Sequence, residues 1–196
     1  MSREQGHASR VGDWIHTYSG GQFWPLDPRA DEVLLVDIAH QLAKVCRFGG
    51  ATLDFYSVAE HSLRVADLVP PELRLQALLH DAAEAYCGDV VRPLKKNLVG
   101  YDEVEARIAR VIGEKFEVDL VNLHTLVIKA DNEMLAVEFR DLLAHRGDRA
   151  PLPEPPRGVR IYETMTPRAA ATLFYQALVT ETGMRCGLAS RHEVGG

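Results

Sequence analysis

Apolar residues recur at intervals of three and four over most of the chain, which is the pattern of amphipathic helices. The first clear stretch, residues 37–45, places Ile38, Leu42 and Val45 on one face. Gly49-Gly50 follows as a stop signal, so we expect a helix that ends near Arg47.

A second helix is expected from residue 57 onward. Ser57-Val58-Ala59-Glu60 matches a capping box, in which the Ser57 hydroxyl and the Glu60 carboxylate satisfy free backbone amides at the start of a helix. This helix carries His61 on its first turn. Pro70-Pro71 ends it, and a third helix is expected over residues 72–86, with an apolar stripe around His80.

The rest of the chain predicts further helices separated by turn-rich segments. Gly88 and Pro93 bracket a polar, basic loop, after which we expect helices over residues 101–116, 120–145 and 167–180. PLPEPPRG is too rich in proline for regular structure, and GVRIYE, which follows it, predicts a short β-hairpin near the C-terminus. The residues after Gly183 are expected to be frayed. The predicted fold class is all-α, a single helical bundle.

Length and composition predict one compact domain. The chain has 196 residues, of which 46% are hydrophobic and 26% charged, enough to bury a single core. We expect one domain over residues 1–196, with its core within about residues 14–182. No apolar run approaches the roughly 20 residues of a membrane helix, and the N-terminus lacks the apolar stretch of a signal peptide. We therefore expect a cytoplasmic protein with no membrane partner.

Charge and cysteine content argue against two further classes. A net charge of -6 offers no electrostatic footprint for a nucleic acid polymer, although a small anion in a local basic pocket stays compatible with it. Cys46, Cys87 and Cys186 are odd in number and show no CxxC spacing, so neither a disulfide framework nor a zinc knuckle is indicated.

Ionisable residues interrupt three of the predicted helices. His80 and Glu84, at positions i and i+4, share one face, and Asp81 lies about 100° around the helix. His61 and Asp131 can complete a set from two other helices, and imidazole with carboxylate suits a divalent transition metal. Taken singly, each could be a capped, core or solvated residue. A shared metal explains them together, since an unpaired carboxylate in an apolar stretch is costly.

The motifs around these residues resemble a known family. EHSLRVA, LLHDAAEAYCGDVVRPLKK and KADNEML are similar to the H...HD...D motifs of the HD-domain metal-dependent phosphohydrolases. FWPLDPR, DIAHQLAKVCRFGG and FYSVAEHS are similar to bacterial and prophage-borne members of the small 5'-deoxynucleotidase-like branch. The resemblance covers roughly residues 14–145 and implies an HD-domain helical fold.

The resemblance also implies roles for individual residues. It implies acid or base roles beside the attacked phosphate for Glu84 and Asp89, and metal ligation by His61, His80, Asp81 and Asp131. The metal would lower the pKa of a bound water and polarise a phosphoryl oxygen. Cobalt, manganese, iron, nickel and zinc all accept such ligands, and a second ion such as magnesium could arrive with the substrate.

Cations near the motif predict where a phosphate would bind. Arg47, Arg92 and Lys95 adjoin the motif, and Arg47 is the strongest candidate by its position in the family. Without the resemblance, Arg47 would equally be a helix C-terminal arginine favoured by the helix dipole. Related deoxynucleotidases have a tryptophan that crowds the sugar 2' position where this chain has Phe48, which leaves sugar selectivity open. Trp24 is a candidate for stacking on the base, or a packing anchor.

The leading hypothesis is hydrolysis of deoxynucleoside 5'-monophosphates to deoxynucleosides and phosphate. One alternative is release of triphosphate or successive phosphates from a nucleotide such as dATP. A non-catalytic nucleotide-binding protein is a second alternative, disfavoured by the retained ligands and Glu84. A cyclic-nucleotide phosphodiesterase would need further His ligands for a second metal, and the one weak candidate, His40, is better interpreted as a core histidine. The resemblance also implies a homo-oligomer.

Overall fold

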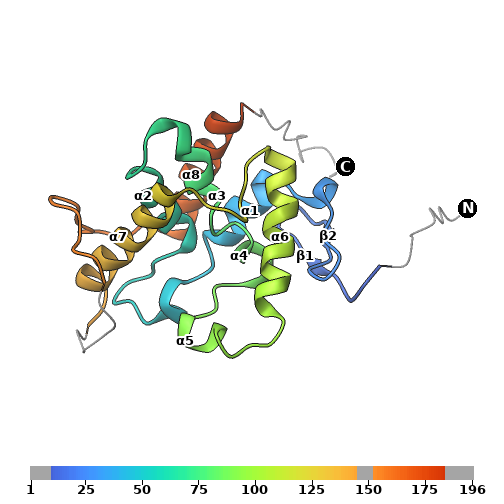
Figure 1. Ribbon diagram of the computed structural model, residues 1–196, viewed down its shortest axis with the longest axis horizontal. Coiled ribbons are helices and arrows are strands. Elements are labelled where there is room, and N and C mark those ends of the chain that lie inside the picture. Colours follow the sequence, from blue (N-terminus) through green and yellow to red (C-terminus); the bar gives the residue numbers. More distant parts are fainter. Residues whose placement is uncertain (1–9, 145–151, 184–196) are drawn as a thin grey trace, which may run out of the picture.

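The computed structural model describes residues 10–144 and 152–183 (Figure 1). This part of the chain is mostly helical, as the composition and periodicity predict, and helices were correctly expected over residues 101–116 and from residue 167. The residues after Gly183, expected to be frayed, lie outside the described residues. The α-helices are α1 (Leu35–Leu42), α2 (Val58–Ala66), α3 (Arg74–Leu79), α4 (Glu84–Cys87), α5 (Arg92–Lys95), α6 (Tyr101–Phe116), α7 (Thr125–Asp141) and α8 (Pro167–Thr182), with short 3-10 helices at Ala30–Glu32, Arg47–Gly50 and Pro71–Leu73.

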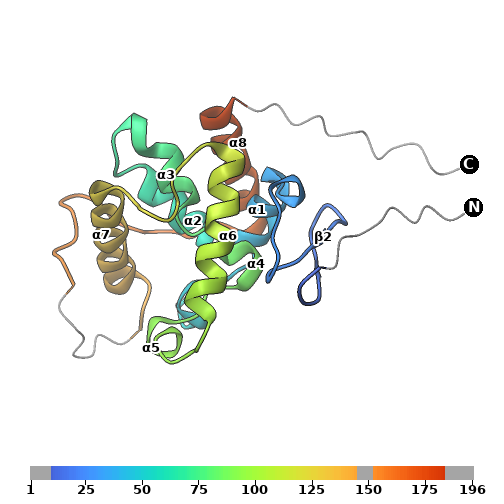
Figure 2. The same cartoon turned by 45° about the vertical axis from the view of Figure 1, so that its right-hand side comes forward.

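The central helix α2 packs against α3, α7 and α8, and α1 packs along α8. In both ribbon views α7 lies on one side of the molecule and β2 on the other, with α6 between them (Figures 1 and 2). The core side chains are fully buried between these helices and include Tyr56, Ile38, Met134 and Phe174. No helix in the described ranges is both long and apolar enough to cross a membrane.

The small sheet of the structure lies near the N-terminus. Strands β1 (Ile15–His16) and β2 (Gln22–Phe23) pair antiparallel, with Ile15 opposite Phe23. The β-hairpin expected in GVRIYE is wrong, because residues 158–163 form no strand. Side chains at the end of α7 form hydrogen bonds with the backbone of this segment instead. The Ile161 amide donates to an Asp141 carboxylate oxygen at 2.9 Å, and Arg140 donates to the Val159 carbonyl at 2.7 Å.

The first predicted helix is shorter than its apolar pattern suggests. α1 ends at Leu42, and the chain then runs extended beside the segment that leads into α2. The Arg47 amide donates to the Tyr56 carbonyl, and the Val58 amide donates to the Val45 carbonyl, both at 3.0 Å. These hydrogen bonds between two extended segments replace helical ones, so Arg47 does not lie at the C-terminus of α1. Its side chain contacts Glu138 of α7 instead.

The start of α2 was predicted in part. The Ser57 side chain accepts a hydrogen bond from the Glu60 amide at 3.2 Å, as an N-cap should. The Glu60 carboxylate does not complete a capping box. It accepts from Arg64 at 2.6 Å and from the Met165 amide at 2.7 Å, which ties α2 to the segment before α8.

The single helix expected over residues 72–86 is broken at the motif. α3 ends at Leu79 and α4 begins at Glu84. Between them the Ala82 amide donates to the Leu79 carbonyl at 2.9 Å, and the Glu84 amide donates to the Asp81 carbonyl at 3.0 Å. These bonds span three residues instead of four and tighten the backbone. His80 and Asp81 therefore leave α3 from a turn and not from a continuous helix face.

The helix expected over residues 120–145 begins later. Asp119 accepts hydrogen bonds from the amides of Val121 and Asn122 at 2.9 and 2.8 Å, which stabilises a turn in place of the first helical residues. His124 then caps α7 by accepting from the Leu126 amide at 3.2 Å. Asp131 accordingly lies on the second turn of α7.

Candidate metal centre

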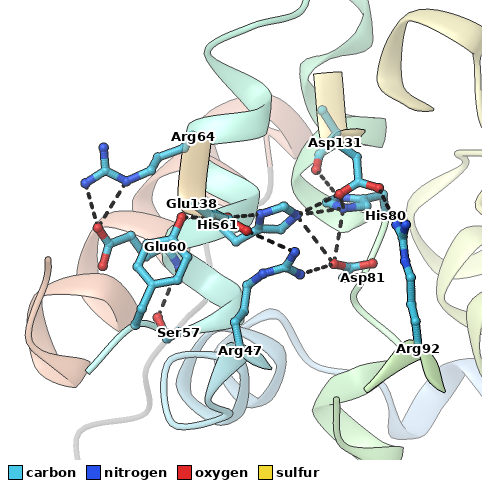
Figure 3. A network of polar contacts seen from close by, with 12 residues as sticks. Arg47, Ser57, Glu60, His61, Arg64, His80, Asp81, Arg92, Asp131 and Glu138 are labelled. Atoms are coloured by element: carbon cyan, nitrogen blue, oxygen red, sulfur yellow. Dashed lines mark hydrogen bonds and ion pairs between the residues drawn. The ribbon is translucent and has the colours of Figure 1, made fainter. Parts of the chain in front are cut away.

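Three segments far apart in the sequence bring His61, His80 and Asp131 together (Figure 3). His61 comes from the first turn of α2, His80 from the turn after α3, and Asp131 from α7. One donor atom of each lies within 4.8 Å of the other two. The Nε2 atoms of the imidazoles are 3.3 Å apart, and Asp131 Oδ1 is 3.2 Å from His61 Nε2. This group could hold a metal ion.

Asp81 lies against the same group. Its Oδ2 is 3.2 Å from His80 Nε2 and 3.7 Å from His61 Nε2. The His61 side chain is fully buried, whereas the Asp81 and Asp131 side chains keep about a fifth of their surface exposed. The four residues predicted as ligands are thus adjacent, with the imidazoles on the buried side and the carboxylates toward solvent.

Hydrogen bonds on the far side of each ring orient the two imidazoles. His61 Nδ1 lies 2.5 Å from Glu138 Oε1, and His80 Nδ1 lies 2.7 Å from the Ala77 carbonyl oxygen. Acceptors at both Nδ1 atoms favour a proton there, which leaves both Nε2 lone pairs directed at the two aspartates. Two lone pairs and two carboxylates repel one another unless a cation lies between them, so the donor set fits a divalent transition metal.

Protons take the place of that cation when no metal is bound. Burial and Arg47 both disfavour the charged His61 ring, but Glu138 and Asp131 outweigh them and raise the pKa of His61 to about 9. Burial raises the pKa of Asp81, yet the stronger attraction of His80 and His61 holds it well below its ordinary value. Metal binding would therefore have to displace protons from the imidazoles.

Glu138 is a site residue that the sequence reasoning missed. It is fully buried on α7, two turns after Asp131, and accepts hydrogen bonds from Tyr56 Oη at 2.9 Å and Arg47 Nη2 at 3.2 Å, besides its contact with His61. The available signal was its spacing, because residues seven apart lie on the same helix face. A second carboxylate on the face of Asp131 would have pointed to this role.

Arg47 contacts the candidate centre through Asp81 and Glu138. Its Nη1 lies 3.4 Å from Asp81 Oδ2, while Nη2 contacts Glu138. The following residue, Phe48, has a left-handed backbone with φ of 56°, which is uncommon for a residue other than glycine. Its ring lies 5.6 Å from the guanidinium carbon of Arg47. The 3-10 segment Arg47–Gly50 thus places the cation and the aromatic ring side by side.

A cavity of about 500 Å³ opens beside the candidate centre. Trp24 does not line it: this ring lies under the guanidinium of Arg10, 4.1 Å from its carbon. The other predicted catalytic and substrate-binding residues share the cavity wall with two of the predicted ligands: Arg47, Phe48, Asp81, Glu84, Asp89, Arg92, Lys95 and Asp131.

Two carboxyl groups in this cavity, those of Glu84 and Asp89, have pKa values raised above the ordinary range. Glu84 is 8% exposed, and its buried Oε2 has no hydrogen-bond partner among the described residues. Burial, followed by the charges of Asp81 and Asp89, raises the pKa of Glu84 well above its ordinary value. Burial also raises the pKa of Asp89, even though Arg47 opposes this effect. Both groups could exchange protons nearer neutral pH than an exposed carboxylate does.

The other two predicted cations, Arg92 and Lys95, form ion pairs with different carboxylates. Arg92 Nη2 lies 3.6 Å from Asp131 Oδ2, with most of its side chain exposed, and Lys95 pairs with Glu105. His40 is not part of the metal-ligating group. It is partly exposed instead of lying in the core as expected, and it stacks on Tyr18 in a separate groove between α1 and α8.

Comparison with known proteins finds two relatives. No protein-family model matches the chain. The chain is 44% identical over 129 residues to the uncharacterized protein YfdR of Escherichia coli strain K12, across 66% of this chain and 72% of that protein. It is 40% identical over 113 residues to the uncharacterized protein RCAP_rcc00048 of Rhodobacter capsulatus, across 53% of this chain and 58% of that protein.

Proposed function

The chain belongs to the family of the Escherichia coli protein YfdR, and since both relatives are described as uncharacterized, we propose its function from the site itself. We propose a metal-dependent phosphohydrolase of the HD-domain superfamily, which removes the 5'-phosphate from (deoxy)nucleoside monophosphates. The observation that carries this proposal is the convergence of His61, His80, Asp81 and Asp131 at the edge of a cavity lined by cations and by two protonatable carboxyl groups.

The sequence resemblance supports the same function. The H...HD...D pattern lies in three separate segments of the chain: EHSLRVA, LLHDAAEAYCGDVVRPLKK and KADNEML. Its ligand positions come from α2, the turn after α3 and α7, and α2 packs against both α3 and α7. A scattered motif whose members meet at one point is a stronger argument than the motif alone.

Four residues would hold the ion in this proposal: His61 and His80 through Nε2, and Asp81 and Asp131 through carboxylate oxygens. When bound, such an ion supplies Lewis acidity and makes a water molecule a better nucleophile. Because four protein ligands do not exhaust the coordination of these metals, water and substrate can share the ion.

Glu84 and Asp89 would manage the protons of the reaction. Glu84, buried in the cavity with an Oε2 that has no partner among the described residues, would accept the proton of the attacking water. Asp89, whose pKa is raised by burial, would donate a proton to the leaving 5'-oxygen of the nucleoside. The P–O bond to the sugar breaks as the bond from the water oxygen to phosphorus forms, which gives nucleoside and inorganic phosphate.

The cations and the aromatic ring would bind the rest of the substrate. Arg47 contacts Asp81 and Arg92 contacts Asp131, so both guanidinium groups would be available to a phosphate bound beside these carboxylates. Phe48 would pack against the sugar beside Arg47. Trp24 is not proposed for the base, because it lies outside the cavity wall.

A second candidate activity is hydrolysis of a nucleoside triphosphate such as dATP. The basic residues of the cavity continue through Lys95, the last residue of α5, to Lys96. A longer phosphate chain could follow them away from the metal. The same four ligands and Glu84 would serve this reaction.

Product analysis tests the proposal. The purified protein would be incubated with Mn²⁺ or Co²⁺ and a panel of ribo- and deoxynucleoside mono- and triphosphates. Free phosphate and nucleoside from monophosphates are expected. Inorganic triphosphate from one nucleotide would support the second candidate instead. If no product forms but calorimetry detects binding of a nucleotide, the protein binds nucleotides without hydrolysing them, and the proposed enzyme activity is refuted.

A further inference from the structure

Glu138 touches both halves of the proposed site. Its Oε1 contacts His61 Nδ1 on the metal side, and its Oε2 contacts Arg47 Nη2 on the phosphate side. Building on the proposed function, we propose that Glu138 is a positioning residue that sets metal affinity through His61 and phosphate affinity through Arg47. It does not touch the metal or the substrate itself.

The metal side follows from the chemistry of imidazole. An imidazole can ligate a metal through Nε2 when its remaining proton lies on Nδ1. The Glu138 carboxylate, 2.5 Å from His61 Nδ1, favours that tautomer, holds the ring plane and increases the electron density at Nε2. His80 has a backbone carbonyl in the same place, which no side-chain substitution can remove.

The phosphate side follows from the geometry of the guanidinium group. Arg47 is held at one end by Glu138 and at the other by Asp81, and only 12% of its side chain is exposed. If Asp81 ligates a metal, its charge is shared with the ion, and Glu138 becomes the main anionic partner of Arg47. Glu138 would then keep the guanidinium at the cavity floor while leaving Nη1 available to a phosphate oxygen.

The surroundings of Glu138 favour a charged carboxylate and restrict the movement of its side chain. The residue is fully buried, and its third hydrogen bond comes from Tyr56 Oη, whose ring is itself fully buried in the core. The guanidinium of Arg47, with Nη2 3.2 Å from Glu138 Oε2, gives this buried carboxylate a positively charged partner. α7 also carries Asp131, so one rigid helix positions a ligand and the group that orients another ligand.

Metal affinity measured without substrate tests the proposal. Glu138→Gln keeps the shape and one acceptor, whereas Glu138→Ala removes both acceptors. Titration of the metal-free proteins with Mn²⁺ or Co²⁺ by calorimetry is expected to show a loss of about tenfold to a hundredfold for Glu138→Ala, and a smaller loss for Glu138→Gln. The visible absorption spectrum of bound Co²⁺ should change in Glu138→Ala, because the His61 ring is no longer oriented.

The phosphate side is tested with inorganic phosphate and the metal-loaded proteins. We expect both variants to bind phosphate several-fold more weakly at saturating metal. The matched control is Glu60→Gln, since Glu60 is an equally buried glutamate of α2 that binds Arg64 and the Met165 amide, away from the cavity. Glu60→Gln should leave both affinities unchanged.

The outcomes separate this inference from the proposed function. Wild-type metal and phosphate affinities in Glu138→Ala would overturn the inference, even if the wild-type protein hydrolyses nucleotides. A wild-type protein that binds metal but hydrolyses nothing would refute the proposed function, while the metal titrations would still decide the role of Glu138. If Glu138→Ala does not fold, Tyr56→Phe removes one of the three bonds to Glu138, and a metal affinity within twofold of wild type in both Tyr56→Phe and Glu138→Gln would also overturn the inference.

Discussion

The two imidazoles of the candidate centre are held in different ways. A side-chain carboxylate accepts from His61, and a backbone carbonyl accepts from His80. A carboxylate polarises an imidazole more strongly than a neutral carbonyl does, so His61 should be the stronger donor of the two. Substitution of Glu138 can therefore change the donor strength of His61. The acceptor for His80 is a backbone carbonyl at the end of α3, which a side-chain substitution does not remove.

Single substitutions should distinguish a metal-ligand role, which affects metal affinity, from a proton-transfer role, which affects turnover. Asp131→Ala is expected to weaken Mn²⁺ binding by more than about tenfold, because it removes a carboxylate donor. Glu84→Gln should retain metal and lower kcat by at least about a hundredfold, because a carboxyl group that moves protons is lost. Calorimetry and steady-state kinetics measure the two effects.

A matched control for Asp131 lies on the same helix. Glu133 pairs with Lys129 on α7, and Glu133→Gln should change neither metal affinity nor turnover. Full activity in Asp131→Ala would remove Asp131 from the proposed site. Loss of metal from Glu84→Gln would move Glu84 from proton transfer to ligation.

The sequence predicted which residues form the candidate centre better than it predicted their surroundings. His61, His80, Asp81 and Asp131 stand out as ionisable residues in apolar helical stretches, and they do converge. Glu138 lies in VEFRDLL among other charged residues, and apart from its seven-residue spacing from Asp131 the local pattern does not distinguish a buried carboxylate from an exposed one. Its partners, Tyr56 and Arg47, are more than 80 residues away, and only the fold brings them together.

At the scale of elements, regular helices were predicted well and their junctions poorly. The bounds of α6 agree with the apolar pattern, because a long amphipathic helix repeats its signal many times. α1 and α3 end earlier than expected, since extended pairing at Arg47 and three-residue hydrogen bonds at the motif compete with helical ones. Such junctions depend on long-range contacts that periodicity does not encode.

The end of α7 gives a prediction for pH dependence. Asp141 accepts hydrogen bonds from Arg140 and from the Ile161 amide, and these bonds, which outweigh burial, lower its pKa from 3.8 to about 2. A depressed folded-state pKa stabilises the fold above the unfolded pKa, and this contribution is lost as the pH falls through the folded pKa. Asp141→Asn should therefore be less stable than wild type at pH 7.

The difference between the two proteins should shrink as the pH falls from about 4 to about 2, where wild-type Asp141 itself becomes protonated. Urea unfolding at several pH values measures it. Tyr162→Phe, a change at an exposed side chain of the same segment, is the control and should track wild type. A constant difference across this range would contradict the assignment of the low pKa to Asp141.

At the scale of the whole molecule, a bound metal would join three separate segments of the core. α2, the turn after α3 and α7 each contribute candidate ligands, and α2 packs on both α3 and α7. An ion that binds the folded protein and not the unfolded chain stabilises it by about 2.7 kcal/mol at a hundredfold excess over Kd. The centre should thus act as a cross-link as well as a reaction site.

Removal of metal should lower the melting temperature accordingly. We expect EDTA treatment to reduce Tm by about 5 to 10 °C for a protein of this size, and Mn²⁺ to restore it. Calorimetric scans with and without the chelator measure the shift. Asp131→Ala should show a clearly smaller rise in Tm at the same Mn²⁺ concentration, because its affinity for the ion is lower. An identical Tm in EDTA and Mn²⁺ would argue against a tightly held ion.

The order of the ligands along the chain bears on when the centre can form. Synthesis delivers His61 first, then the His80-Asp81 pair, and Asp131 with Glu138 only after a further 50 residues. A nascent chain that ends before α7 has two imidazoles but neither the last carboxylate nor the acceptor that orients His61. If the proposed centre binds an ion, tight binding would have to wait until α7 has left the ribosome and docked on α2, so metal loading would be among the last events in maturation.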